Sequence, residues 1–96
     1  MTSDIVGKKF DEGKLMYGLV PVVSLKEIVK VLTFGCKKYE RDNWKHVENA
    51  ENRYTDALFR HIEAWRDGES HDPETGIHHL GHAGCNIIFL LWFKLT

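Results

Sequence analysis

The chain has 96 residues, which is enough for one domain with a single small hydrophobic core. Hydrophobic residues make up 43% and charged residues 28%, a composition typical of folded soluble proteins and unlike that of disordered ones. Thirteen Lys and Arg against fourteen Asp and Glu leave a formal net charge of −1, which argues against a general nucleic-acid coat protein.

The apolar runs and the cysteines indicate the compartment. The longest apolar run, residues 87–93, is far shorter than the roughly 20 residues that span a bilayer. Residues 1–8 contain no apolar stretch of signal-peptide length. Cys36 and Cys85 lie far apart, as expected for free thiols in a reducing cytosol. We therefore expect a cytoplasmic protein.

The hydrophobic pattern predicts an all-α domain over residues 1–96. Glycines interrupt residues 1–20, which we expect to form an irregular arm. Helical periodicity predicts helices over 24–41, 52–67 and 77–94. Ser24 and Glu27 have the spacing of a capping box, and Asp72 or Thr75 could cap the last helix.

The second half of the last helix is apolar nearly all round, so more than one neighbour has to cover it. Phe34, Phe59 and Trp92 fall outside the main apolar stripes. Three helices of this size bury little surface alone. We expect homo-oligomerisation, as a dimer or a larger assembly, to complete the core.

Residues 77–86 hold the densest group of chemically active side chains. His79, His82 and Asn86 lie close to one line along a helix, and His78 is four residues before His82. Imidazole nitrogens could bind a transition metal or hydrogen-bond to phosphate oxygens. Alternatively, the histidines are ordinary core or surface groups.

Gly81 and Gly84 lie inside the same helix, where each glycine costs about 1 kcal/mol relative to alanine. Close packing of another helix is the favoured reason for them. Close approach of a ligand is the alternative.

Several basic and aromatic residues suit a nucleotide. Arg60 could bind phosphate as a two-pronged donor or pair with Asp56 on the helix surface. His61, in an apolar helical face, could be functional or a buried structural histidine. Further candidates are an N-terminal pair around Gly13 and a set around the end of the first helix: Asp11, Lys14, Lys38, Tyr39, Asn43 and Trp44. For the residues around Gly13 the alternative is a flexible tail. For the residues around the end of the first helix it is a helix end with a packed tryptophan.

The acidic residues form two groups. Glu63 belongs to a stripe on the second helix, for which a solvated face is the simpler interpretation. Glu69 and Asp72 follow in a loop beside the histidine helix. Converging carboxylates could hold a hard cation such as Mg²⁺.

Seven short segments occur in a distinctive order: KFDEGK (9–14), LVP (19–21), LTFGCKKY (32–39), NW (43–44), ALFRH (57–61), DPETG (72–76) and HLGHA (79–83) with Asn86. Over about residues 8–95 this set resembles the phage-associated dATP/dGTP diphosphohydrolase N-terminal domain family, which is akin to the MazG-like nucleotide pyrophosphohydrolases.

The resemblance implies an all-α oligomer that binds a purine nucleoside triphosphate. Water would attack between the α and β phosphates and release monophosphate and pyrophosphate, with help from Mg²⁺ or Mn²⁺. One feature departs from the MazG-like pattern, because this chain has no adjacent glutamate pair. Its first helix offers only Glu27 and Glu40.

These considerations give the predicted site. The predicted catalytic residues are Glu69, Asp72 and His79. The predicted metal ligands are Glu63, Glu69, Asp72 and His79. The predicted nucleotide-binding residues are Asp11, Lys14, Lys38, Tyr39, Asn43, Trp44, Arg60, His61, His82 and Asn86.

The sequence is also compatible with two functions other than nucleotide hydrolysis. A nucleotide-binding protein without turnover could sequester a nucleotide signal of host immunity, in the cytoplasm of a phage-infected or lysogenic bacterium. A structural or interaction protein with incidental histidines is the third reading. No membrane contact and no stable nucleic-acid complex are expected.

Overall fold

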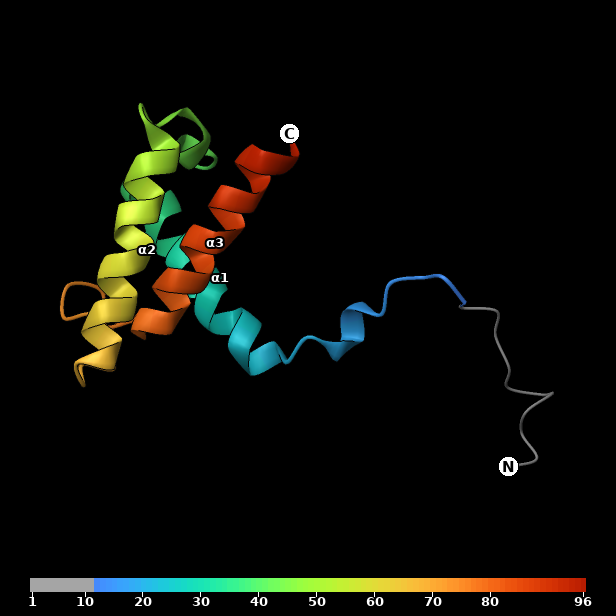
Figure 1. Ribbon diagram of the computed structural model, residues 1–96, viewed down its shortest axis with the longest axis horizontal. Coiled ribbons are helices and arrows are strands. Elements are labelled where there is room, and N and C mark those ends of the chain that lie inside the picture. The colour runs from blue at the N-terminus through green and yellow to red at the C-terminus, as the bar shows by residue number, and fades with distance from the viewer. Residues whose placement is uncertain (1–11) are drawn as a thin grey trace.

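A computed structural model describes residues 12–96 and shows three α-helices (Figure 1). They are α1 (Val22–Lys38), α2 (Ala50–Arg66) and α3 (His79–Leu95), with the short 3-10 helices η2 (Tyr17–Leu19) and η3 (Asn43–His46). Over residues 12–96 the only β-type pairing is one isolated bridge between His71 and His78. The predicted all-α class is confirmed, and each helix end lies within three residues of its predicted position.

The helix starts differ from the sequence prediction. Pro21, in extended conformation, is the N-cap of α1, and Ser24 lies inside the first turn without capping it. The predicted capping box is therefore wrong, because the Glu27 carboxylate instead accepts a hydrogen bond from the backbone N–H of His78 at 3.0 Å. Neither Asp72 nor Thr75 caps α3. His78 does, through a ring nitrogen that accepts from the N–H of Leu80 at 3.0 Å.

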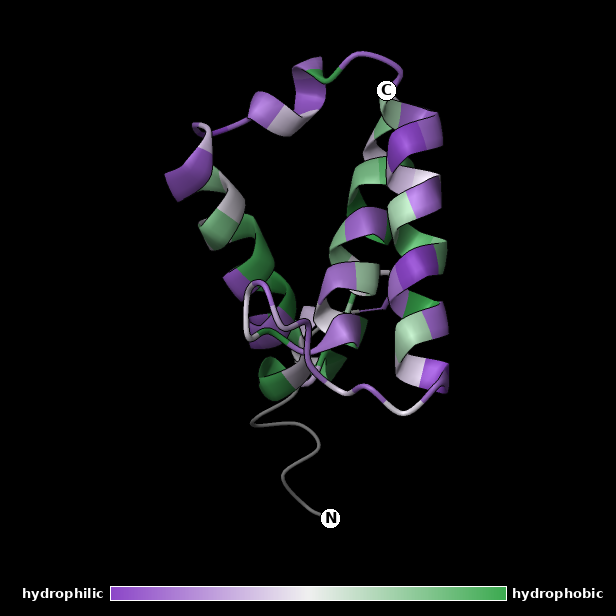
Figure 2. Ribbon diagram, turned by 90° about the vertical axis from the view of Figure 1, so that its left-hand side faces the viewer, coloured by the Kyte–Doolittle hydropathy of each residue, from purple (hydrophilic) through white to green (hydrophobic). Residues whose placement is uncertain are grey.

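α3 packs against both other helices, while α1 and α2 spread apart (Figure 2). α1 and α3 approach each other closely at two glycines of α3. A Cβ on Gly81 would lie 2.9 Å from the Cγ and 3.0 Å from the carbonyl oxygen of Glu27, and one on Gly84 would lie 2.7 Å from the Cδ1 of Ile28. The interpretation of these glycines as a helix-packing feature is confirmed.

An aromatic cluster closes the opposite end of the domain. The Trp44 ring stacks on Phe89 with centroids 4.3 Å apart and meets Trp92 edge-on at 5.1 Å. The hydroxyl of Tyr54 donates to the carbonyl of Trp44 at 2.8 Å. These contacts attach η3 to α2 and α3, so Trp44 is the packed tryptophan that the sequence allowed.

The hydrophobic core is sparse for a chain of this length. Within residues 12–96 the buried hydrophobic residues are Ala50, Ile77, Ala83 and Cys85, and α1 buries no residue. Large apolar side chains of the arm and of α1 are exposed instead, among them Leu19 (73%) and Val23 (78%). None of the helices in the described chain has both the length and the apolar character that crossing a membrane requires.

The substitution Gly81→Ala is expected to lower the free energy of unfolding by about 1–3 kcal/mol, because the new methyl group meets backbone atoms of α1 that cannot move alone. The cost should exceed the gain of about 1 kcal/mol in helix propensity. Urea denaturation measures the change. Gly35→Ala is the matched control: it lies in α1 with open space around it and should stabilise the domain by about 0.5–1 kcal/mol. Equal stabilisation by both variants would contradict the close crossing.

Candidate functional site

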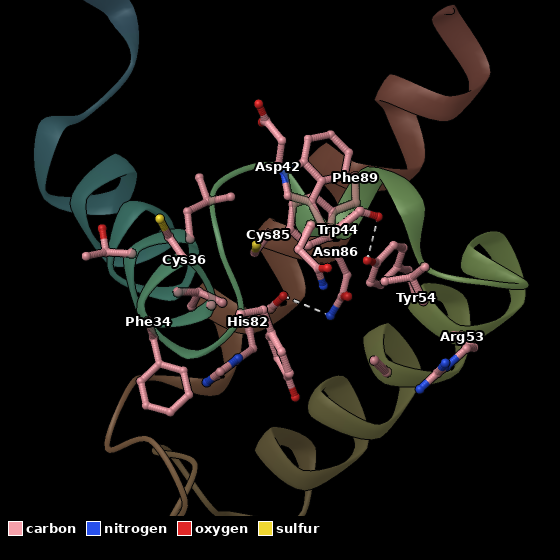
Figure 3. A pocket seen from close by; sticks show the side chains of 18 of the residues that line it. Phe34, Cys36, Asp42, Trp44, Arg53, Tyr54, His82, Cys85, Asn86 and Phe89 are labelled. Carbon is pink, nitrogen blue, oxygen red and sulfur yellow. Dashed lines mark hydrogen bonds between the residues drawn. The ribbon is translucent and has the colours of Figure 1, made fainter.

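The spreading of α1 from α2 leaves a cleft of about 1060 Å³ (Figure 3). Its walls come from the C-terminal half of α1, the connection over residues 39–48, α2 and α3. Seven of the predicted nucleotide-binding residues line it: Tyr39, Asn43, Trp44, Arg60, His61, His82 and Asn86.

Two left-handed residues shape the connection between α1 and α2. Asp42 has φ 66° and precedes η3, and Asn49 has φ 56° and precedes α2. Asp and Asn adopt this conformation more readily than other side-chain-bearing residues. The chain therefore leaves α1, crosses the end of the cleft and enters α2 over residues 39–49.

The cleft wall carries cations that are available to an anion. Arg41, Arg53 and Arg60 all line the cleft, and none of them forms an ion pair within residues 12–96. The surface pair of Arg60 with Asp56, which the sequence left open, is not formed. Acidic residues line the cleft as well, and one of them, Asp42, is paired with Lys45 at 3.4 Å.

The α3 side of the cleft is mostly uncharged. The Asn86 side-chain amide donates to the carbonyl of His82 at 3.0 Å, which leaves its amide oxygen without a hydrogen bond in the described structure. Figure 3 shows Asn86 between His82 and the aromatic rings of Trp44 and Phe89. Burial raises the pKa of the Cys85 thiol to about 12, so this thiol stays protonated at neutral pH.

One end of the cleft meets a chain of hydrogen-bonded groups that we call the Glu69–His79–His61 relay. The carboxylate of Glu69 lies 2.6 Å from Nε2 of His79, and Nδ1 of His79 lies 2.8 Å from Nδ1 of His61. A carboxylate only accepts hydrogen bonds, so Nε2 of His79 is the donor. With a neutral His79 ring, its Nδ1 then accepts from Nδ1–H of His61. The lone pair of His61 is left on Nε2.

His82 and Asp72 lie on the other side of His61. The rings of His61 and His82 are stacked, with centroids 4.4 Å apart and planes 5° apart. Nε2 of His82 lies 2.7 Å from the Thr75 hydroxyl and 3.6 Å from a carboxylate oxygen of Asp72. Burial lowers the pKa of both histidines, to about 4 for His61. Both rings are therefore neutral at neutral pH.

The loop that precedes α3 holds Asp72 in place. Its Oδ1 accepts from the N–H of Glu74 at 2.8 Å, and its backbone N–H donates to the carbonyl of Ile77 at 2.9 Å. Gly76, with φ 71°, supplies the left-handed turn and donates to the carbonyl of Asp72 at 2.7 Å. This compact turn leaves Oδ2 of Asp72 facing His82.

The remaining predicted site residues do not line the cleft. Glu69 and His79 are bound to each other in the relay, and Asp72 faces His82 from the loop. Lys38 forms an exposed ion pair with Glu74 at 3.8 Å. Lys14 and Glu63 are exposed, on the arm and on α2 respectively. Asp11 lies outside the described residues.

Sequence reasoning passed over part of the cleft wall. Arg53 and Tyr54 precede Arg60 and His61 by seven residues, which is two helical turns, so they share the faces of those residues. That spacing could have found them. Arg41 lies just beyond the end of α1, and no local pattern marks it as a cleft residue.

One group of metal-ligating residues converges in the described chain. His61, Asp72 and His82 each offer a ligand atom, and these atoms all lie within 4.8 Å of one another. Of the predicted metal ligands, Asp72 belongs to this group, whereas Glu63, Glu69 and His79 do not.

The fold and cleft define an all-α domain with a histidine-lined, arginine-bearing cavity. The family model for the N-terminal domain of dATP/dGTP diphosphohydrolases matches residues 5–96, and the chain belongs to this family. A protein of Salmonella phage PMBT28 named dATP/dGTP diphosphohydrolase is 36% identical over 88 residues. The match covers 92% of this chain and 30% of that protein. No solved structure matches the chain.

Proposed function

We propose that the cleft binds a purine (deoxy)nucleoside triphosphate, which the protein hydrolyses to monophosphate and pyrophosphate. The observation that carries this proposal is the cleft itself, where three arginines that form no ion pair within residues 12–96 lie beside two neutral histidines. Carboxylates also line the cleft: Glu40, Asp42, Glu48 and Asp56. Membership of the diphosphohydrolase family and the name of the phage relative support the choice of substrate.

Each part of the cleft has a role in this proposal. Guanidinium groups bind phosphate oxygens with two parallel hydrogen bonds. Arg41, Arg53 and Arg60, which we call the arginine wall, would therefore hold the triphosphate. Tyr39 and the side-chain amides of Asn43 and Asn86 would contact the base and sugar. Neutral His61 and His82 would position water without repelling a cation. Electrostatic stabilisation of the phosphates would supply most of the rate acceleration.

Mg²⁺ or Mn²⁺ is the cofactor expected from the family resemblance, and it would neutralise charge on the phosphates when bound. Among the described residues, Asp72 is the carboxylate that converges with the two cleft histidines. Glu69 and His79 do not line the cleft, and the ring of His61 lies between them and the substrate. They would act by orienting His61. In this proposal Asp72 would help to hold the cation beside His82, while Glu69 and His79 are positioning residues.

A second candidate is nucleotide binding without turnover, as in a phage protein that sequesters a nucleotide signal of host immunity in the host cytoplasm. Two observations favour it. The chain spans only 30% of the length of its phage relative, whose name describes the whole protein. Within residues 12–96, moreover, no three carboxylates converge on one point. Such a protein would use the arginine wall and the aromatic residues in the same way.

One experiment separates the two candidates. The protein is incubated with ribo- and deoxynucleoside triphosphates and cyclic dinucleotides, with and without Mn²⁺, and the solution and the denatured protein are analysed by liquid chromatography. We expect monophosphate and pyrophosphate from a purine nucleotide, only with metal, and none from Asp72→Ala. An unaltered nucleotide recovered from the denatured protein would establish sequestration instead. A panel left untouched would contradict both.

The substitution Arg60→Ala is expected to weaken binding of the selected nucleotide about 10- to 100-fold, because it removes a charged hydrogen bond to phosphate worth about 1.5–3 kcal/mol. Titration calorimetry measures the affinity. Arg66→Ala is the matched control, since Arg66 is an exposed arginine at the end of the same helix and does not line the cleft. Equal effects of the two substitutions would place the nucleotide elsewhere.

We also propose that a second copy of the chain covers the exposed apolar surface of the arm and α1. The core is sparse: the four small or medium-sized hydrophobic residues buried within 12–96 stabilise a domain poorly. Leu19, Val22 and Val23 are each more than 70% exposed. A dimer or larger assembly of this kind would bury these side chains without changing the helices.

Light scattering after size-exclusion chromatography tests the assembly. The substitution Val23→Asp should shift the protein to monomers and lower its melting temperature, because it buries a carboxylate in the apolar contact. Ser24→Asp adds the same charge to the next residue, which is exposed and polar, and should leave the assembly intact. A monomeric wild-type protein that melts at a temperature independent of its concentration would contradict the proposal.

A further inference from the structure

We propose that His61, Asp72 and His82 form a binding site for one divalent transition-metal ion of the class of Zn²⁺, Fe²⁺ and Co²⁺, in preference to Mg²⁺. This inference rests on the proposed function for the cleft and names the ligands of a metal there, but it departs from the Mg²⁺ that the family resemblance implies. The site lies where the loop before α3 meets α2 and α3.

The ligand set is the first observation. Three atoms from three segments of the chain lie within 4.8 Å of one another, two of them imidazole nitrogens and one a carboxylate oxygen. Imidazole favours transition metals, whereas Mg²⁺ favours oxygen ligands alone. Since Asp72 is the one carboxylate in this group of described residues, an all-oxygen site for Mg²⁺ does not fit the structure.

The Glu69–His79–His61 relay is the second observation. Metal-binding histidines almost always donate their other ring N–H to a hydrogen-bonded partner, which fixes the tautomer and the ring orientation. With a neutral His79 ring the relay does this for His61: Nδ1–H of His61 donates to His79, which donates in turn to Glu69. The lone pair on Nε2 of His61 is thereby left for a ligand bond.

Asp72 and His82 complete the arrangement. One carboxylate oxygen of Asp72 is held by the N–H of Glu74, while the other faces His82 at 3.6 Å. A carboxylate oxygen of Asp72 and one ring nitrogen of each histidine lie within 4.8 Å of one another, close enough for one ion to contact all three. An ion would take the place of the Thr75 hydroxyl as the partner of His82.

The position of the cluster relates it to the cleft. His61 and His82 line the cleft, whereas Asp72 approaches them from the loop outside. Three protein ligands leave coordination positions open, as in catalytic rather than structural metal sites. Phosphate oxygens of a nucleotide held by the arginine wall could occupy them.

Metal alone, without nucleotide, tests the inference. Protein without a histidine tag is stripped with chelator, and Zn²⁺ and Mg²⁺ are titrated separately by calorimetry, with the visible absorption of Co²⁺ as a second readout. We expect one Zn²⁺ per chain, at least about 100-fold tighter than Mg²⁺, and Co²⁺ bands typical of nitrogen ligation.

Substitutions identify the ligands. Asp72→Asn and His82→Gln should each weaken Zn²⁺ binding by more than about 100-fold, and Glu69→Gln, which loosens the relay, by about 10- to 100-fold. Glu63→Gln is the control, an exposed carboxylate on α2 outside the cluster, and should bind Zn²⁺ as the wild type does. Circular dichroism checks that each variant is folded.

Two results would overturn the inference: no stoichiometric binding of Zn²⁺, or binding that survives Asp72→Asn and His82→Gln in folded protein. Nucleotide retention in chelator-treated protein is measured separately. Nucleotide binding without a Zn²⁺ site would leave the proposed cleft standing and remove the metal site. A Zn²⁺ site without any nucleotide binding would leave the metal site standing and remove the proposed nucleotide cleft.

Discussion

The close crossing of α1 and α3 at Gly81 is the constraint on which the rest of the structure depends. The absence of a side chain there lets the backbone of Glu27 approach α3, and the Glu27 carboxylate then reaches the N–H of His78 at the start of that helix. Because α1 is held near its N-terminal half, its C-terminal half diverges from α2 (Figure 2). The cleft is the space that this divergence leaves.

The histidine cluster lies close to this crossing, at the N-terminal half of α3. His79 and His82 are buried side chains of the helix that contacts both others, and the 67–78 loop folds back to bring Glu69 and Asp72 against them. Buried ionisable groups are costly unless they are hydrogen-bonded or neutral. Here the two carboxylates are partly accessible, while the rings between them are hydrogen-bonded. The arrangement concentrates chemically active groups at one end of a cleft whose other end is aromatic.

The same geometry serves turnover and sequestration equally well at the level of binding. In both proposals the three arginines and the aromatic residues of the cleft would contact the ligand, and only the loop side of the histidine cluster would take part in chemistry. The apolar side chains of the arm and α1 that remain exposed are the surface on which the proposed assembly with further copies depends. Binding by a cleft that is preformed between diverging helices needs little rearrangement of the backbone.

The amino-acid sequence by itself determined the helices, since a 3.6-residue apolar period and loops rich in Gly, Pro and Asp depend only on near neighbours along the chain. It also indicated the histidines of α3 and the residues around the end of the first helix as candidates for a binding site, because these residues cluster in the sequence. Tertiary structure alone decided the rest. The partners of Glu27 and His61 lie 51 and 18 residues away, and no local spacing predicts such contacts. For the same reason the capping box at Ser24 was wrong, and Arg41 was passed over. The surroundings of Ser24 and Arg41 are set by how α1 packs on α3.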